Sequence, residues 1–416
     1  MHRWPSCRTL PRPVRRRAAC LLAVLVAALG GCQNGTTPPP GTPPATRASE
    51  TPTIRVKIGE SVPQVRVTVR EKYQIYDLGT KQLLLAGDSL PGGVFAVTGG
   101  KLLLDGRPLG TPQVTVAAEK GGSIAVAGQA YHGNLRVLAE AGNVTLVNCV
   151  NLDDYLAGVV GAELYKGWHL EANRAQAIVA RSYALYQVKN PRCGPLYDVT
   201  DSPATHQAYR GVSGETATSR EAAVTTRGVV VTTDEAGPQR IFEAFFSSTC
   251  GGHTVPAHTR FASAPRIKPF QGVACAWCTK SPNYLWSRKI GGKDLAARLQ
   301  QADAALNLKS VAKAWVSKDN LTAEGCVKGV WVAGDRGPNF LVSTKAFKAC
   351  FPEGQRVLSD RFAVTVSGGE VVVNGRGNGH GIGLCQYGAQ ELATQGHSAE
   401  EILAYYYPGS ILARVY

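Results

Sequence analysis

The chain has 416 residues, a formal net charge of +15 and 44% hydrophobic residues, so it can bury a large core in two or three domains. Its Lys and Arg residues form no dense block, and the signatures of RNA-recognition, zinc-knuckle and helix-turn-helix proteins are missing, so we expect no nucleic-acid partner. A diffuse positive charge suits a polyanionic partner such as a cell wall or a membrane surface, and it is equally consistent with an ordinary soluble basic protein.

Residues 1–31 are predicted to be an export signal. An arginine-rich segment precedes an apolar run at 18–29, which is too short to span a bilayer because spanning takes about 20 residues. The run ends in Leu-Gly-Gly-Cys32, which resembles a bacterial lipobox, where the cysteine is lipidated. We expect an exported protein, anchored by lipid at Cys32 to a bacterial membrane and facing the periplasm or cell wall. The alternative is an ordinary secretory signal with an incidental Cys32.

Three further segments follow the signal. Residues 32–53 form a Pro/Thr-rich linker, which suits a tether. Residues 54–134 form a β-rich N-terminal module, because apolar runs such as IRVKI and VRVTV alternate with Gly-Gly and Asp-Gly turns. Residues 135–416 form the remaining domain. Removing the signal takes away six arginines and leaves a net charge of about +9 (15 − 6).

Residues 151–189 change to helical periodicity and contain one carboxylate in an unusual position. Glu163 follows the apolar positions Leu152, Tyr155, Leu156, Val159 and Val160 on the same helix face, just before the turn at Gly167 and Trp168. A carboxylate near a helix C-terminus faces the negative end of the helix dipole, and apolar neighbours solvate it poorly. Both effects raise its pKa, which makes Glu163 a candidate general acid.

Strands are predicted at 227–232, at 241–247 and at EVVVN (370–374), followed by a glycine-rich loop and a helix around 386–395. The fold class is therefore α+β, with a β-rich N-terminal part before a mixed region. In the loop GRGNGHGIGLCQYGA (375–389) glycine alternates with other residues, so backbone N–H groups can approach a ligand beside the donors Arg376, His380, Gln386 and Tyr387. The alternative is a tight glycine-rich hairpin with a solvated histidine.

Eight cysteines remain if Cys7 and Cys20 leave with the signal and Cys32 is acylated. An even number in an oxidising compartment first indicates disulfides. Four residues nevertheless have the types and spacing of a structural zinc site, in the segments C-x2-H and C-x2-C: Cys250, His253, Cys275 and Cys278. A Cys275–Cys278 disulfide is the competing interpretation.

Residues 198–212 collect polar side chains that suit a polar ligand, among them Asp201, Gln207 and Tyr209, although a polar surface loop would have the same composition. No H-E-x-x-H or G-x-S-x-G motif is present, which argues against zinc proteases and serine hydrolases.

Taken together, the blocks DDYLAGVVGAEL, WHLEANRAQAIVARSYAL, THQAYRGV, FFSSTCGGHT and GRGNGHGIGLCQYGAQELATQG resemble the stage II sporulation protein D and amidase-enhancer family of bacterial cell-wall proteins. The resemblance covers residues from about 135 onward. It implies a lytic transglycosylase acting on peptidoglycan glycan strands, with Glu163 as the catalytic acid.

The resemblance also implies a substrate cleft lined by Arg181, by Gln207 and Tyr209, and by the glycine loop, and it strengthens the case for zinc near the C-G-G-H-T segment. Two positions depart from the family pattern, Asn378 where an aromatic is common and Cys385 where serine is usual. Cys385 could instead form a disulfide.

One protonated carboxyl is sufficient for lytic cleavage, whereas two-carboxylate hydrolysis needs a partner about 5–9.5 Å away, for which Asp201 is the best candidate. Catalysis by Glu163 needs no cofactor. The rival hypothesis is a non-catalytic protein that binds peptidoglycan and stimulates an N-acetylmuramoyl-L-alanine amidase. A purely structural wall tether is a third.

Overall fold

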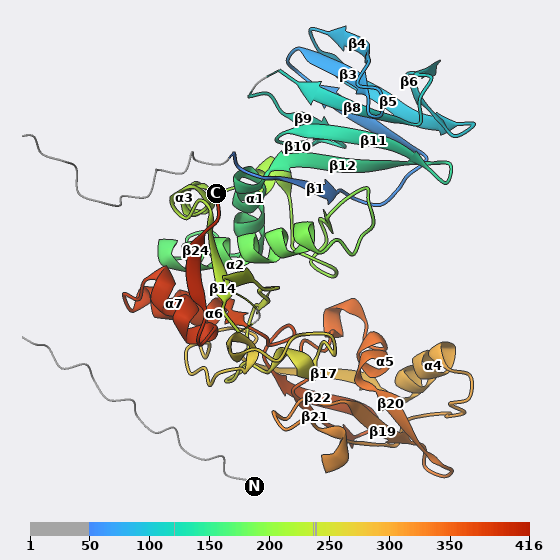
Figure 1. Ribbon diagram of the computed structural model, residues 1–416. Helices are drawn as coiled ribbons and strands as arrows, with labels where there is room; N and C mark the ends of the chain where they lie inside the picture. Colours follow the sequence, from blue (N-terminus) through green and yellow to red (C-terminus); the bar gives the residue numbers. More distant parts are fainter. Residues whose placement is uncertain (1–49, 120, 236, 238) are drawn as a thin grey trace, which may run out of the picture. The chain divides into compact units, whose positions relative to one another are not determined.

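The computed structural model describes residues 50–119, 121–235, 237 and 239–416 (Figure 1). The predicted export signal, the lipidation site Cys32 and the linker up to residue 49 lie outside these residues. Within the described part of the chain, no helix combines the length and apolar character needed to cross a membrane.

The first strands build two antiparallel sheets around a shared core. One sheet has the order β13-β1-β12-β11-β8-β3-β4, in which only β13 runs parallel to its neighbour, and the other has the order β10-β9-β2-β5-β6-β7. Alternate residues point inward, as in β8, where Val114 and Val116 are fully buried. The strands are β1 (Thr53–Lys57), β2 (Gln64–Val69), β3 (Tyr73–Asp77), β4 (Leu83–Gly87), β5 (Leu90–Thr98), β6 (Lys101–Leu104), β7 (Arg107–Pro108), β8 (Gln113–Ala118), β9 (Ile124–Val126), β10 (Gln129–Tyr131), β11 (Asn134–Glu140) and β12 (Asn143–Asn151).

Strand pairing runs across the boundary expected between residues 134 and 135. β11 pairs with β8 of the predicted module and with β12, which in turn pairs with β1. Ala141 and Gly142 join β11 to β12 with positive φ angles of 48° and 82°, the conformation that a two-residue hairpin turn requires. The β-rich module therefore extends to Asn151, where the first helix begins.

The helical region predicted at 151–189 forms two helices, α1 (Leu152–Glu163) and α2 (Leu170–Lys189). Asn151 caps α1 by accepting a hydrogen bond from the backbone N–H of Asp153, and His169 caps α2 in the same way through Glu171. The Gly167 turn separates them.

The remaining elements surround α2. The strand predicted at 227–232 is β14, the one at 241–247 is reduced to the short strands β15 and β16, and the predicted C-terminal helix is α6. The helix α7 and the strand β24, which pairs with β14, were not predicted. The bounds are β13 (Val199–Thr200), α3 (Ala217–Thr225), β14 (Val229–Thr233), β15 (Arg240–Ile241), β16 (Phe246–Ser247), β23 (Leu384–Cys385), α6 (Gln386–Thr394), α7 (Ala399–Tyr406) and β24 (Ile411–Arg414).

Between β16 and β23 the chain builds a further hydrophobic core from two three-stranded sheets and two helices. This region is drawn in yellow to orange in Figure 1. Its elements are β17 (Leu285–Gly291), α4 (Gly292–Ala302), β18 (Lys313–Trp315), β19 (Gly329–Ala333), β20 (Asn339–Ser343), α5 (Thr344–Ala349), β21 (Phe362–Ser367) and β22 (Glu370–Arg376). The α+β class is confirmed.

Candidate active site

Glu163 is the last residue of α1, as the apolar periodicity predicts. Its Oε1 accepts a hydrogen bond from the backbone N–H of Ala208 at 2.8 Å, and its Oε2 lies 3.5 Å from Nε2 of Gln386. Burial raises the pKa of the Glu163 carboxyl, and the hydrogen bonds from Ala208 and Gln386 only partly offset this effect. The carboxyl is thus biased toward the protonated form, which a general acid needs.

The end of α1 is held in place by an unusually close backbone contact. The helix packs on the 3-10 turn Gly211–Gly214, and a Cβ at Gly161 would lie 2.1 Å from the carbonyl oxygen of Gly214. Only glycine allows this approach. Gly161 is two residues before Glu163, and Ala208 lies just before the 3-10 turn. The contact between Gly161 and Gly214 therefore holds the Glu163 carboxyl against the backbone N–H of Ala208.

Gln386 reaches the site from the other end of the sequence, as the first residue of α6 after the glycine loop. The loop folds back tightly at Gly383, where φ is +66° and a Cβ would lie 2.1 Å from the carbonyl oxygen of Phe245. Nε2 of Gln386 also lies 3.5 Å from Oε1 of Gln176 on α2. The side chain of Gln176 is 1% exposed, and its Nε2 has no hydrogen-bond partner among the described residues.

Three aromatic side chains from the segments that follow Glu163 and Gln386 form a cluster, which we call the aromatic cluster: Tyr165, Trp168 and Tyr387. The Trp168 and Tyr387 ring centroids are 5.0 Å apart, and Tyr165 lies 5.5 Å from Trp168 and 6.0 Å from Tyr387. Tyr165 is 60% exposed. Rings of this kind, apolar on their faces and accessible to solvent, can bind the apolar face of a sugar. Tyr387 was among the predicted binding residues, whereas Tyr165 and Trp168 were not recognised in the sequence.

Arg181 was expected to bind substrate, and the structure corrects this. Its side chain is 0% exposed and donates to five acceptors, among them the carboxylate of Asp153 and the hydroxyl of Tyr416. The guanidinium therefore ties α2 to α1 and to the end of the chain. A group with every donor direction occupied inside the protein has none left for a glycan.

Gln207 and Tyr209 are corrected for the same reason. Gln207 is 0% exposed and accepts a hydrogen bond from the Tyr155 hydroxyl at 3.1 Å, and Tyr209 is 1% exposed and donates to Asn148 at 2.9 Å. They fix the segment that carries Ala208, so they support the site from behind. Asp201 accepts a hydrogen bond from the backbone N–H of Gly59 at 3.1 Å, and no described contact joins it to Glu163.

The two donors at the start of the glycine loop have different surroundings. The His380 ring packs edge-on against Phe245 and Phe261, and its Nδ1 accepts a hydrogen bond from the backbone N–H of Ile382 at 3.0 Å. Burial and the nearby Arg260 charge lower the pKa of His380 to about 4, so the ring is neutral and holds the loop together. The Arg376 guanidinium lies over the Tyr284 ring, 5.6 Å from its centroid.

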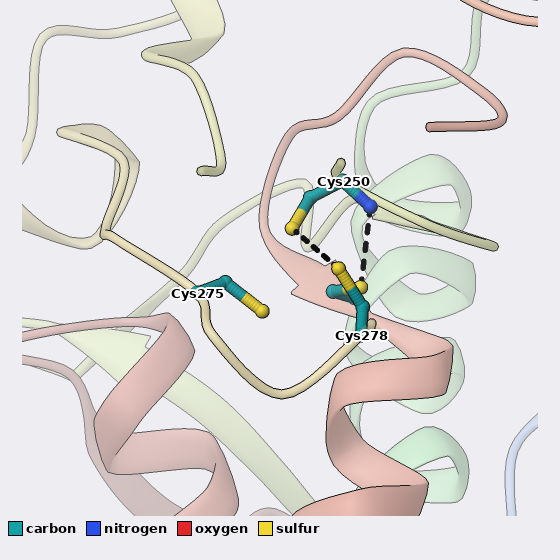
Figure 2. Close-up of side chains that lie close together, drawn as sticks. Cys250, Cys275 and Cys278 are labelled. Atoms are coloured by element: carbon teal, nitrogen blue, oxygen red, sulfur yellow. Dashed lines mark hydrogen bonds between the residues drawn. The ribbon is translucent and has the colours of Figure 1, made fainter. Parts of the chain in front are cut away.

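The metal-ligand set predicted from sequence needs one correction. The sulfur atoms of Cys250, Cys275, Cys278 and Cys385 all lie within 4.8 Å of one another, and all four residues are buried. Figure 2 shows the three labelled cysteines with their sulfur atoms turned toward one another. His253 does not belong to the group, since its Nδ1 donates to the carbonyl oxygen of the adjacent Thr254. Cys385, the residue that departs from the family pattern, takes its place.

The even cysteine count suggested disulfides, but the structure shows none among the described residues. All eight cysteines there are free thiols. Four buried sulfur atoms this close fit the tetrahedral arrangement of a zinc site with four cysteine ligands. Hydrogen bonds from the neighbouring thiols, first from Cys250, lower the pKa of Cys278, which favours a thiolate there. Thiolate is the form that binds zinc.

Residues 140–233, which include Glu163 and Ala208, match the profile of SpoIID, stage II sporulation protein. Over these residues the chain is similar to the SpoIID family. The stage II sporulation protein D of Bacillus subtilis is 29% identical over 278 residues, covering 64% of this chain and 75% of that protein. An uncharacterized protein of Brachyspira hyodysenteriae is 25% identical over 357 residues, covering 86% of this chain and 91% of that protein. The amidase enhancer of Bacillus subtilis is 26% identical over 302 residues, covering 62% of this chain and 40% of that protein. The predicted resemblance to the SpoIID and amidase-enhancer family is confirmed.

Proposed function

We propose that this protein cleaves the glycan strands of peptidoglycan by lytic transglycosylation, with Glu163 as both acid and base. One observation carries the proposal: a partly buried carboxyl with a raised pKa lies between the N–H of Ala208 and Gln386, and the partly exposed aromatic cluster is built from the segments that follow Glu163 and Gln386 in the sequence. The cell-wall role supported by the SpoIID match and by the names of the Bacillus relatives agrees with it.

In the proposed mechanism the proton moves through one oxygen of Glu163. The N–H of Ala208 holds Oε1, so Oε2 carries the proton and donates it to the glycosidic oxygen as the bond to C1 of the N-acetylmuramic acid breaks. The C6 hydroxyl of the same sugar then attacks C1, and its proton returns to Oε2. The products are a 1,6-anhydro end and a free hydroxyl on the leaving sugar, so water and a second carboxylate are not needed.

The four cysteines would hold a zinc ion with a structural role. Zinc bound by four thiolates has no open coordination position, so it would supply no catalytic chemistry. It would join the loop of Cys250 to the Cys275–Cys278 turn and to Cys385, the residue immediately before Gln386. We further propose, from the sequence alone, export and lipid anchoring at Cys32.

The decisive test uses Glu163→Gln, which keeps the shape of the side chain and removes proton transfer. Losing a general acid typically lowers a rate by about 10²–10⁴-fold. Purified protein is incubated with glycan strands stripped of stem peptides, and anhydromuramyl ends are measured by mass spectrometry. Glu60→Gln, at an exposed position on the β-rich module, is the matched control and should cleave at the native rate.

The outcome also separates the rival functions. Cleavage by Glu163→Gln at the native rate would remove Glu163 from the mechanism. Binding of glycan strands without cleavage by the native protein, together with stimulation of an N-acetylmuramoyl-L-alanine amidase, would make it an amidase enhancer. If the native protein neither binds nor cleaves glycan strands, the wall-tether hypothesis remains.

A further inference from the structure

A cavity separate from the Glu163 site lies where the glycine loop meets the region that contains α5. Its volume is about 410 Å³, within the range of small-ligand sites. It contains none of the groups that surround Glu163. Its lining residues are Arg260, Lys345, Lys348, Leu358, Asp360, Gly379 and His380.

The cavity has an excess of positive charge. Arg260 and Lys348 both form ion pairs with Asp360. Nζ of Lys348 lies 2.7 Å from Oδ1 of Asp360. Lys345 is exposed and forms no ion pair within the described part of the chain. Three cations thus face one carboxylate, and because His380 is neutral the cavity keeps a net charge of +2 (3 − 1).

The positive groups also crowd one another. Burial, and then the charges of Arg260 and Arg356, lower the pKa of Lys348 to about 8. An anion that entered the cavity would stabilise the charged form of Lys348 and compensate this repulsion. Both the charge excess and the crowding therefore point to an anionic ligand.

We propose that this cavity binds a carboxylate carried by a glycan strand, as a subsite separate from Glu163. The inference rests on the proposed function, since it assumes a peptidoglycan ligand. Asp360 already neutralises one of the three cations, and one carboxylate would lower the remaining charge from +2 to +1. A carboxylate of this kind is present on the lactyl group of muramic acid and on the stem peptide.

The spacing along the chain places the cavity within reach of the same strand. His380 lines the cavity, and Gln386, six residues later, contacts Glu163. Six residues span at most about 22 Å even when fully extended. An oligosaccharide of a few residues covers such a distance, so one strand can contact both places.

The test measures binding without cleavage, in the Glu163→Gln protein. Its affinity for a denuded GlcNAc–MurNAc tetrasaccharide is compared by calorimetry with its affinity for neutral chitotetraose. Adding Lys345→Ala, at an exposed position where folding is tolerant, should weaken tetrasaccharide binding roughly two- to tenfold. It should leave chitotetraose binding unchanged. Lys313→Ala, an exposed lysine on β18, is the matched control and should change neither.

A tetrasaccharide that still bears stem peptides identifies the source of the carboxylate. If the peptide tightens binding and Lys345→Ala removes only that gain, the cavity binds the stem peptide. If Lys345→Ala weakens binding of the denuded tetrasaccharide, the cavity binds the lactyl group. Equal effects of Lys345→Ala on chitotetraose and on the tetrasaccharides, no effect on any of the three sugars, or no glycan binding would each overturn the subsite. If the native protein produces no anhydro ends while the carboxylate dependence remains, the lytic function fails and the subsite stands.

Discussion

Replacing Arg181 by leucine separates a structural role from a substrate-binding one. The guanidinium is fully buried, and the substitution removes its hydrogen bonds to the carbonyl oxygens of Ala223 and Val229 at 2.9 and 3.2 Å. It also removes the ion pair with Asp153 at 3.2 Å. Breaking a buried pair from one side costs about 3–5 kcal/mol, because the remaining groups stay buried without a partner.

The structure places the expected loss at the lower end of this range. Asp153 keeps three other partners, since it accepts hydrogen bonds from the Tyr416 hydroxyl at 2.8 Å and the Thr51 hydroxyl at 3.4 Å, and lies 3.5 Å from Nε of Arg227. The carboxylate is therefore not left alone, and we expect Arg181→Leu to lower the free energy of unfolding by about 3 kcal/mol. The measurement is urea denaturation of the native and variant proteins.

The matched control is Arg174→Leu, on the same helix and two turns earlier. Arg174 is 29% exposed and pairs with Glu171 and Glu221 near the surface. Exposed pairs contribute about 0–1 kcal/mol, so this variant should unfold close to the native midpoint. The reasoning is refuted if Arg181→Leu is as stable as the control and instead binds glycan strands more weakly.

Three further predictions concern the site itself. Because the pKa of Glu163 is raised by burial, cleavage should fall as the pH rises through that pKa, and the stability that the protonated carboxyl provides should be lost over the same interval. Glu163→Gln should therefore be more stable than the native protein at neutral pH but not at acidic pH. The same difference in melting temperature between the two proteins at both pH values would contradict this. Gly161→Ala should lower cleavage and stability together, because its Cβ would meet the Gly214 carbonyl at 2.1 Å, whereas Gly167→Ala, with open space around it, should affect stability only through its positive φ. Cys385→Ser should reduce the zinc retained by chelator-washed protein and His253→Ala should not; equal retention in all three proteins would argue against the four-cysteine site.

The apolar periodicity of α1 was sufficient to place Glu163 at a partly buried helix end and to predict its raised pKa. Both properties depend on neighbours within a few residues along one helix, and such local relations can be followed in a sequence. The α+β class, α2, β14 and α6 could be predicted on the same basis. The glycine alternation likewise located a loop that folds back tightly.

Only the tertiary structure decided what covers each predicted side chain. Periodicity could place Arg181 on a face of α2, yet it could not show that α1, α3 and the last residue of the chain close over that face. Short spacing favoured His253 as a metal ligand, but Cys385, 135 residues away from Cys250, meets the other cysteines. Gln386 lies 223 residues from Glu163 in the sequence and contacts it. Side-chain burial and ligand sets depend on such long-range packing, because a residue spacing specifies a helix face or a turn and not the segment that folds against it.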